Sequence, residues 1–393
     1  MKIRMNLDVL ILGGGIAGLW TAAILRSAGY RVALLESNAL GAGQTLQSQG
    51  IIHAGLKYAL LGQVNETAQL ISTVAKDWTA AMAGEGAVDL RQAKIAATAQ
   101  HMLVPSGLMG ALAGALGHAA LGETIQNLKP NAWPAGLADL GFKGNVIAMH
   151  EPGVDTQSVL SALLEQLENT CYAYDPSTAR ISLRVDGGFE SIALDQTEIF
   201  PAHVISVAGY GNEWLAEQMN FKATAQHRPL KMVLLKGDLP HAYWHGVGGS
   251  FRPAFTISTH KTSVGETVWY IGGAVAEAGL EQDDQTLFRE TAAALQKYLP
   301  NLDLKNMQWT ALPVMRVEGY DPRGWLPDRP SYQQHHNVTL GWVNKLTLAP
   351  LMARELLAKL LPPGGEGEAA RLPLPSAQIA AYPWDEVIWQ QQR

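Results

Sequence analysis

A glycine-rich turn near the N-terminus constrains this chain more than any other feature of its sequence. Residues 13–18 read Gly-Gly-Gly-Ile-Ala-Gly and satisfy the spacing Gly-x-Gly-x-x-Gly. The apolar run 8–12 before the turn predicts a short buried strand, and residues 16–28 after it predict a helix that ends at Gly29. Residues 32–35 predict a second strand, so the glycines stand at the first turn of a predicted strand–helix–strand unit.

Each glycine of this turn has a physical task. Gly13 permits the tight turn, Gly15 lets the backbone approach a pyrophosphate, and Gly18 lets the helix lie close to the strand. The helix N-terminus, with Ile16 and Ala17, presents N–H groups and a partial positive charge to phosphates. The turn therefore predicts a dinucleotide site. A glycine-rich turn that only joins a strand to a helix is the alternative, and the register of the neighbouring elements argues against it.

An acid stands at the end of the second predicted strand. The carboxylate of Glu36 can accept hydrogen bonds from ribose hydroxyls, and it would repel a 2′-phosphate. Ser37 follows it and is expected beside the same ribose. The glycine turn and the acid alone leave NAD and FAD both open.

The next block of the sequence favours FAD, through a family resemblance. Residues 41–45 read Gly-Ala-Gly-Gln-Thr, and residues 48–58 read Ser-Gln-Gly-Ile-Ile-His-Ala-Gly-Leu-Lys-Tyr. These segments resemble the D-amino acid oxidase-like superfamily of FAD-dependent oxidoreductases, which includes glycine oxidase, glycerol-3-phosphate dehydrogenase and L-2-hydroxyglutarate dehydrogenase. In that superfamily a turn of small residues follows the ribose-binding acid, and a segment like residues 50–55 runs along the flavin ring. The resemblance implies FAD as the cofactor.

The resemblance continues at wide intervals as far as about residue 360. Residues 151–155 resemble the return of the chain to the FAD domain, and residues 204–209 resemble the strand and turn that close over the cofactor. Residues 228–230 resemble the start of a strand of the substrate domain. The glycine turn and the resemblance together imply that FAD contacts Gly13, Gly15, Ile16, Ala17, Gly18, Glu36, Ser37, Gly43, Gln44, Thr45, Gly50, Ile51, Ala208, Gly209, Gly341, Lys345, Leu346 and Thr347.

The last family element departs from the usual pattern. Residues 341–350 read Gly-Trp-Val-Asn-Lys-Leu-Thr-Leu-Ala-Pro, which is one residue shorter than the family sequence and lacks its second glycine. In relatives that loop brings backbone N–H groups toward the pyrimidine edge of the flavin, where negative charge accumulates on reduction. Lys345 can supply the missing positive charge, and an ordinary solvated lysine is the alternative. The short loop also motivates a second hypothesis, a flavin-bearing subunit or partner-binding protein with weak or no turnover of its own.

Histidine 53 is the candidate base. In this superfamily the flavin performs the hydride chemistry, and the protein supplies position and electrostatics. The resemblance places His53 beside the flavin ring, and its unperturbed pKa near neutrality suits the removal of a proton from a substrate hydroxyl. A packed or hydrogen-bonded supporting role is the alternative. His260 is a weaker candidate for the same task.

Three cations are candidates for holding an anionic substrate. Lys57 stands where glycerol-3-phosphate dehydrogenases carry an arginine, and Tyr58 can orient the same group. Arg252 and Arg316 are included because a guanidinium binds a carboxylate or phosphate bidentately. Structural ion pairs are the alternative for both arginines.

These candidates predict a dehydrogenase or oxidase for a small anionic substrate. The Ile-His-Ala-Gly stretch at residues 52–55 is more similar to relatives that oxidise alcohols, so a 2-hydroxy acid or a polyol phosphate is expected before an amino acid. The electron acceptor stays open between oxygen, a quinone and another protein. An NAD-dependent dehydrogenase is a further alternative.

Composition excludes several other classes of protein. A formal net charge of −6 offers no basic stripe for a nucleic acid backbone. The single cysteine, Cys171, excludes an intramolecular disulfide and a cysteine-based zinc site, so we expect a cytoplasmic protein. No metal site is expected, because His335 and His336 are adjacent and lack acidic companions at ligand spacing. Glycines and Asp8 within residues 1–19 argue against a signal peptide, and no spanning helix is expected, although peripheral membrane contact stays open.

The remaining pattern predicts an α/β protein with a Rossmann-like FAD-binding domain and an interleaved α+β substrate domain built on an antiparallel sheet. Further helices are predicted at 67–83, 156–168, 284–298 and 351–361, and further strands at 204–207, 231–235 and 267–271. The expected FAD-binding domain comprises 1–83, 145–215 and 310–365, the substrate domain comprises 84–144 and 216–309, and 366–393 form a C-terminal extension.

Overall fold

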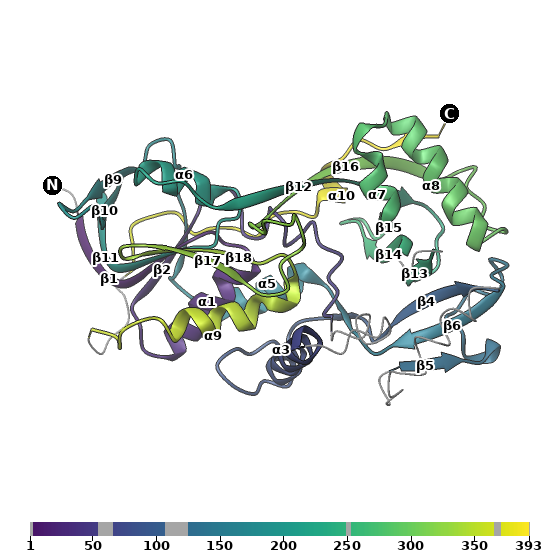
Figure 1. The fold of residues 1–393 in the computed structure, drawn as a ribbon, viewed down its shortest axis with the longest axis horizontal. Coiled ribbons are helices and arrows are strands. Elements are labelled where there is room, and N and C mark those ends of the chain that lie inside the picture. Colours follow the sequence, from purple (N-terminus) through teal and green to yellow (C-terminus); the bar gives the residue numbers. More distant parts are fainter. Residues whose placement is uncertain (1–2, 54–65, 107–124, 249–252, 365–370, 393) are drawn as a thin grey trace.

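The computed structural model describes residues 3–53, 66–106, 125–248, 253–364 and 371–392. These residues form an elongated molecule with one large β-sheet toward each end of the long axis (Figure 1). One sheet is mostly parallel and the other mostly antiparallel, so the expected α/β architecture is confirmed.

The first sheet contains the predicted strand–helix–strand unit. Its central path runs β17–β18–β11–β1–β2–β8, in which the pairs from β18 to β8 are parallel and β17 is antiparallel to β18. The antiparallel β9 and β10 extend one side of it. Its strands are β1 (Ile3–Leu12), β2 (Val32–Glu36), β8 (Cys171–Ala173), β9 (Arg180–Leu183), β10 (Phe189–Leu194), β11 (Thr197–Ser206), β17 (Ser331–His335) and β18 (Val338–Trp342).

Helices cover both faces of this sheet, which is why its central strands are apolar without alternation. Val9 and Ile11 of β1 pack into one core with α1 (Ile16–Ser27), α5 (Thr156–Glu165) and α9 (Ala349–Leu357). Leu10 and Leu12 pack on the opposite face with Leu215 of α6 (Gly211–Gln218). Figure 1 shows α1, α5 and α9 together on one side of the strands and α6 on the other.

The second sheet has the order β19–β16–β12–β15–β14–β13–β4–β6–β5. Helix α8 (Asp284–Tyr298) covers one of its faces, over a core that includes the buried rings of Trp244, Trp269, Trp309 and Phe288. Its strands are β4 (Gln100–Pro105), β5 (Ile125–Leu128), β6 (Gly144–Met149), β12 (Ala225–Lys236), β13 (Tyr243–Val247), β14 (Pro253–Lys261), β15 (Thr267–Gly272), β16 (Gln308–Gly319) and β19 (Gln390–Gln391).

A long two-stranded ribbon connects the two ends of the molecule. Strands β12 and β16 pair antiparallel from Ala225 opposite Gly319 to Lys236 opposite Gln308. The ribbon runs from the first sheet into the second (Figure 1). Residues of β12 and β16 therefore reach the region between the sheets.

The helices predicted from periodicity correspond to α3 (Glu66–Met82), α5, α8 and α9. Helix α8 begins and ends as predicted, whereas α5 and α9 end earlier than the apolar pattern does. Strand β11 is longer than the predicted 204–207. Its first half alternates between buried and exposed side chains, so it lacks the continuous apolar run on which the prediction rested. Strands β6 and β16 belong to the second sheet, so boundaries at 145 and 310 would fall inside strands. We therefore propose domain boundaries after Met149 and after Gly319.

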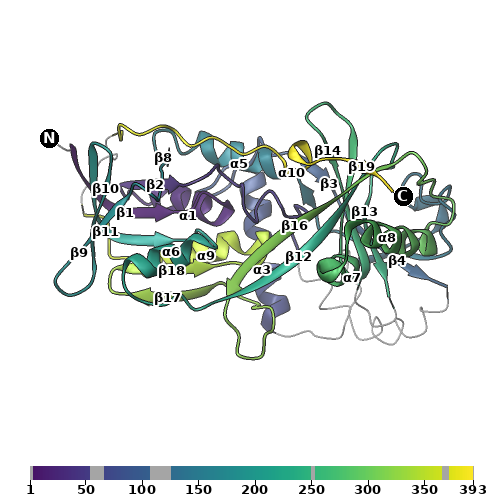
Figure 2. The same ribbon diagram turned by 90° about the horizontal axis from the view of Figure 1, so that it is seen from above.

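The C-terminal segment after residue 370 is a strap that contacts both sheets. The Leu40 N–H donates to the Gln378 carbonyl at 2.8 Å, and the Ala173 N–H donates to the Pro375 carbonyl at 2.8 Å. Farther along, Trp384 is buried and β19 pairs with β16. Figure 2 shows this segment running along the length of the molecule from the first sheet to the second. The expected C-terminal extension therefore contributes to the core.

Candidate active site

A cavity of about 860 Å³ lies between the two sheets. Its walls come from the turn after β1, the segment after β2, the turns after β11 and β18, and the ribbon strands β12 and β16. Ligands of open α/β sheets bind at the carboxyl ends of the parallel strands, and this cavity has that position. Its volume falls within the range of roughly 300–1,000 Å³ that is usual for small-molecule and cofactor sites.

The glycine turn forms one corner of the cavity, and its geometry requires glycine. Gly13 has a φ of +105°, and a Cβ added there would lie 2.6 Å from the Cα of Ala208. A Cβ on Gly18 would lie 1.9 Å from the Gly13 carbonyl oxygen, so Gly18 lets α1 lie against the turn. Gly15 lines the cavity, and an added Cβ there would meet only the Thr45 hydroxyl, at 3.1 Å.

Hydrogen bonds hold the corner in a shape that fits a nucleotide. The Gly14 N–H donates to Glu36 Oε2 at 2.6 Å, and the Asn38 N–H donates to Glu36 Oε1 at 2.8 Å. Because a carboxylate offers roughly four lone-pair sites, Glu36 retains acceptor capacity for ribose hydroxyls. The Ile16 N–H donates to Thr45 Oγ1 at 3.0 Å, which caps α1. The helix N-terminus, the acid and the small residues that a dinucleotide needs are therefore assembled at one place.

Most of the predicted cofactor contacts lie on this cavity. Gln44 also joins the nucleotide corner to the ribbon, because its Oε1 accepts from the Val317 N–H at 3.2 Å. Those lining the cavity are Gly13, Gly15, Ile16, Ala17, Glu36, Gly43, Gln44, Thr45, Ile51, Ala208, Gly209, Gly341, Lys345 and Leu346.

Four predicted cofactor contacts do not line the cavity: Gly18, Ser37, Gly50 and Thr347. Gly50 has a φ of +68°, and a Cβ there would lie 2.4 Å from the Val154 carbonyl oxygen, so its task is close backbone packing. Thr347 accepts a hydrogen bond from the His53 N–H at 2.9 Å and therefore supports the candidate base.

His53 lines the cavity and has a carboxylate partner that sequence reasoning missed. Its Nδ1 lies 3.2 Å from Oε2 of Glu151, and the side chain of His53 is 37% exposed whereas that of Glu151 is 1% exposed. Glu151 lies in the segment 151–155 that resembles the family, but no role was predicted for it. The only local signal was an acid two residues after the apolar run 146–149, which lies in β6.

Arg316 is the cation that the structure places in the cavity wall. It is half-buried on β16, and among the described residues its buried Nε has no hydrogen-bond partner. Burial lowers the pKa of Arg316, while the nearby carboxylates of Glu318 and Glu277 act in the opposite direction. A guanidinium has so high a pKa that it remains charged at neutral pH even after this lowering, so this wall offers a positive charge to a ligand.

Of the remaining candidates that the structure describes, only Lys345 is found in the cavity lining. Lys57, Tyr58 and Arg252 lie outside the described residues. His260 does not line the cavity, and burial lowers its pKa to about 3, so the prediction of a second base there is wrong. Lys345 does line the cavity, in extended backbone just before the turn η3 (Leu346–Leu348).

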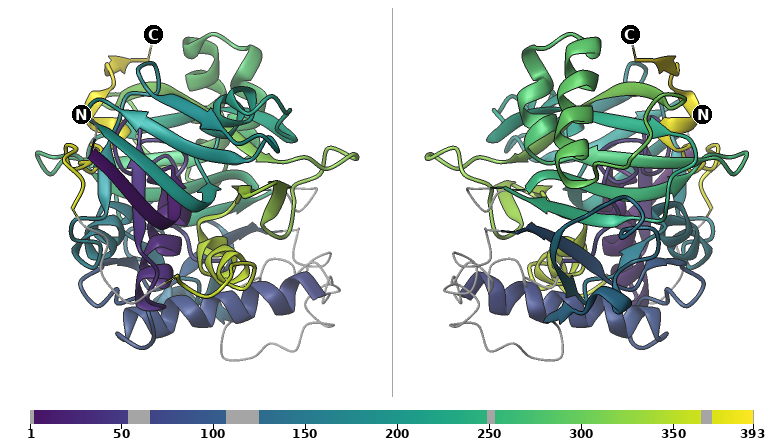
Figure 3. Two further views of the ribbon diagram at one scale, coloured as in Figure 1. Left: turned by 90° about the vertical axis from the view of Figure 1, so that its left-hand side faces the viewer. Right: turned by 90° about the vertical axis from the view of Figure 1, so that its right-hand side faces the viewer.

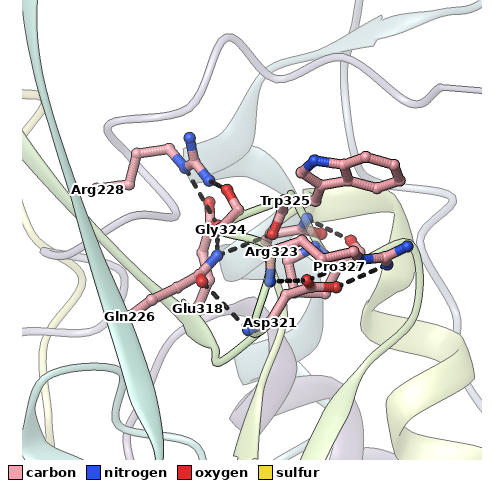
Figure 4. Close-up of polar contacts among 9 residues, drawn as sticks. Gln226, Arg228, Glu318, Asp321, Arg323, Gly324, Trp325 and Pro327 are labelled. Atoms are coloured by element: carbon pink, nitrogen blue, oxygen red, sulfur yellow. Dashed lines mark hydrogen bonds and ion pairs between the residues drawn. The ribbon is translucent and has the colours of Figure 1, made fainter.

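A loop at residues 320–330 borders the cavity and is fixed to the ribbon by a polar network (Figure 4). Arg228 Nε lies 3.5 Å from Oε2 of the fully buried Glu318. Gln226 donates to the same carboxylate at 3.3 Å and to the Trp325 carbonyl at 3.0 Å. Figure 3 shows the loop projecting from the side of the molecule.

Two predicted absences can be set against the described part of the chain. It contains no cluster of three or more histidine, cysteine or acidic side chains able to hold a metal ion. It also contains no helix that is both long and apolar enough to cross a membrane.

The family model described as DAO, FAD dependent oxidoreductase, matches residues 8–360. The chain belongs to this family of FAD-dependent oxidoreductases. Over 391 residues it is 36% identical to a probable FAD-dependent oxidoreductase from Pseudomonas aeruginosa, a match that covers 98% of this chain and 99% of the relative. The crystal structure of an FAD-dependent oxidoreductase from the same organism has a TM-score of 0.83 and 32% identity, with coverage of 98% and 99%.

More distant members show the same fold. Glycine oxidase from Geobacillus kaustophilus has a TM-score of 0.62 at 15% identity, with coverage of 91% of this chain and 94% of that one. Reduced L-α-glycerophosphate oxidase from Mycoplasma pneumoniae, with FAD bound, has a TM-score of 0.60 at 17% identity, with coverage of 96% and 99%. The family resemblance, the FAD cofactor and the assignment as an oxidoreductase are thus confirmed for this DAO-family chain.

Proposed function

We propose that this DAO-family enzyme oxidises a small anionic substrate, a 2-hydroxy acid or polyol phosphate before an amino acid. The observation that carries the proposal is Arg316, a half-buried guanidinium in the cavity wall whose buried Nε has no partner among the described residues. A guanidinium in a partly buried wall attracts a carboxylate or phosphate more strongly than an exposed one does, because the surroundings screen its charge less than water does.

The nucleotide corner supports the proposed cofactor contacts. The amides of Gly15 and Ala17 at the start of α1 would hold the pyrophosphate, and Glu36 would accept from the ribose. The Ile16 N–H already donates to Thr45 and would border the nucleotide without bonding to it. FAD, when bound, accepts the hydride that leaves the substrate carbon. Met232 and Val314 give the ribbon side of the cavity an apolar lining, which excludes water from the reacting groups.

His53 would take the proton from the substrate hydroxyl. Its side chain borders the cavity, so it can reach a bound ligand, and its Nδ1 faces Glu151. The proton of the hydroxyl then moves to the imidazole while the hydride leaves the same carbon, so that a carbonyl product results. Arg316 would hold the anionic group and orient the carbon for that transfer.

The fold relatives are consistent with an anionic substrate. The printed names glycine oxidase and L-α-glycerophosphate oxidase refer to substrates that each carry an anionic group, one a carboxylate and the other a phosphate. The fold alone does not choose between them. The choice of hydroxy acid or polyol phosphate rests on the Ile-His-Ala-Gly stretch at 52–55.

An anaerobic reduction screen tests the proposal. The purified holoenzyme is mixed with a panel of 2-hydroxy acids, polyol phosphates and amino acids, and bleaching of the visible flavin absorbance is recorded. Bleaching by one hydroxy acid or polyol phosphate supports the proposal. Bleaching by amino acids alone refutes the preferred substrate class, and no bleaching by any member refutes the proposed function. Reoxidation by oxygen, a soluble quinone or a protein acceptor then identifies the acceptor class.

A further inference from the structure

We propose that Glu151 is a positioning residue that keeps the proton of neutral His53 on Nδ1, so that Nε2 remains free to accept a proton. The proposal deepens the proposed function and rests on it, since it concerns the same candidate base. The family resemblance at residues 151–155 implies no role for Glu151. It also implies none for the buried residues that are hydrogen-bonded to it.

The first link is the contact between the imidazole and the carboxylate. Nδ1 of His53 lies 3.2 Å from Oε2 of Glu151. A carboxylate only accepts hydrogen bonds, so this contact requires a proton on Nδ1 of His53. A neutral imidazole carries one proton, so a hydrogen bond donated by one ring nitrogen leaves the other nitrogen unprotonated. Nε2 is therefore the nitrogen left with a lone pair.

The second link fixes the direction of the hydrogen bonds behind Glu151. Gln100 is fully buried, and its Nε2 donates to Oε2 of Glu151 at 3.2 Å and to the Glu151 carbonyl at 3.4 Å. Oε1 of Gln100 faces Nε2 of His245, which is also buried. Turning the Gln100 amide over would bring its oxygen against both Glu151 oxygens. Only one orientation therefore satisfies the chain, with His245 donating to Gln100 and Gln100 donating to Glu151.

This chain makes Glu151 an acceptor from two sides. Donors on both sides of a buried carboxylate favour its ionised form and compensate for its lost hydration. Because Gln100 donates to Oε2 of Glu151, the carboxylate cannot transfer a proton to Gln100. The arrangement therefore orients His53 in the way that a buried carboxylate orients the base of a catalytic triad.

The backbone of His53 is held independently of its ring. Its N–H donates to Thr347 Oγ1 at 2.9 Å, and the Thr347 carbonyl accepts from Nε1 of the buried Trp78 at 3.0 Å. Replacing Glu151 should consequently change the ring's tautomer and angle without displacing the main chain. That separation lets a positioning role be distinguished from a merely structural one.

The test reads the tautomer directly, without a substrate. The FAD-loaded enzyme is prepared with ¹⁵N-histidine, and the ring signals of His53 are assigned by their loss in His53→Gln. We expect Nδ1 of the wild-type His53 to be protonated and Nε2 to show the shift of an unprotonated nitrogen. In Glu151→Leu no acceptor faces Nδ1, so the proton is expected to move to Nε2. Glu151→Gln would not serve, because Gln100 donates to the same position and would keep the amide oxygen, an acceptor for Nδ1, there.

Kinetics supply the second readout once a substrate is known from the reduction screen. Glu151→Leu should lower the rate constant of flavin reduction by about 10²-fold or more, with KM changed by less than about threefold, because general-base catalysis typically contributes 10²–10⁴-fold. Glu151→Asp, which keeps the charge, should recover part of that loss. Glu198→Leu is the matched control, because it removes a carboxylate bonded to Ser191 on the first sheet, outside the cavity lining.

The two failures are distinguishable. A wild-type His53 with its proton on Nε2, or a His53 spectrum that Glu151→Leu leaves unchanged, would overturn the positioning role whatever the substrate is. Equal losses in kcat and in FAD content for Glu151→Leu, with no change of tautomer, would also overturn it. A tautomer that follows Glu151 in an enzyme that no panel member reduces would instead refute only the proposed function.

Discussion

The two walls of the cavity differ in how their residues are distributed along the chain. The nucleotide wall is built within residues 13–45, where the glycine turn, Glu36 and Thr45 are neighbours in sequence and in space. The opposite wall brings together His53, Glu151 and Arg316 from three distant segments. A local wall can be recognised by its spacing, whereas a wall assembled by tertiary structure can be recognised only in three dimensions.

The close packing of the glycine turn in the nucleotide wall predicts the largest effect. Gly18→Val would place a branched side chain where even a Cβ lies 1.9 Å from the Gly13 carbonyl oxygen, so α1 must move away from β1. We expect purified protein with little or no FAD, seen as loss of the visible flavin absorbance. Gly43→Ala is the comparison, because an added Cβ there meets no described atom within 4 Å and should leave thermal stability unchanged. Full FAD content in Gly18→Val would refute the predicted close packing.

The strap that joins both regions predicts the next effect. Trp384 is 1% exposed, stacks on Tyr382 with 4.3 Å between ring centroids, and donates to the Lys261 carbonyl at 3.0 Å. Trp384→Ala should lower the free energy of unfolding by about 3–5 kcal/mol, as large-to-small core changes do. Denaturant unfolding of the variant measures this. Ile388→Ala, at an exposed position of the same strap, should change it little.

The substrate wall predicts a loss of activity without a loss of cofactor. Arg316→Leu should reduce kcat/KM for an anionic substrate by about 10- to 150-fold, equivalent to the roughly 1.5–3 kcal/mol that hydrogen bonds to charged groups contribute. The flavin spectrum should stay as in wild type, because Arg316 lies on the ribbon and not at the nucleotide corner. Arg289→Leu, which removes a cation from an exposed site on α8, is the matched control. An unchanged kcat/KM would remove Arg316 from the substrate wall.

The smallest expected effect is a pH dependence at the start of β1. Hydrogen bonds from Arg31 lower the pKa of Asp8, so the ionised carboxylate stabilises the folded state. Because the folded-state pKa is depressed, this stabilisation is complete above the unfolded pKa of about 4 and is lost as pH falls below it. Asp8→Asn should therefore lose less stability than wild type when the pH is lowered from 5 to 3. Parallel denaturant curves at both pH values measure the difference.

The sequence predicted the nucleotide wall because its signals are local. The tasks of Gly13, Gly15 and Glu36 follow from one turn between a strand and a helix. The role of Thr45 as the cap of α1 was not foreseen, since the hydroxyl reaches the helix across a loop. His53 was predicted from the family resemblance, and Arg316 only as a residue type suited to binding an anion. Whether they face one cavity depends on the ribbon that brings β16 to the nucleotide corner.

Other features escaped prediction for physical reasons that can be stated. Glu151 shows no periodicity of its own, and its partners Gln100 and His245 come from strands that pair with one another only in the folded sheet. The C-terminal strap has only short apolar runs separated by prolines and polar residues, a pattern that is typical of a surface tail. Its backbone hydrogen bonds to β8 and to Leu40 appear only in the folded structure. Both cases depend on long-range pairing, which no local pattern encodes.

A crystal structure of the holoenzyme tests the central claim most directly. The account predicts the FAD pyrophosphate on the amides at the start of α1, the ribose on Glu36, and the flavin ring in the part of the cavity bordered by His53 and Arg316. A nucleotide corner filled by side chains, or a flavin ring placed away from both of these residues, would contradict it.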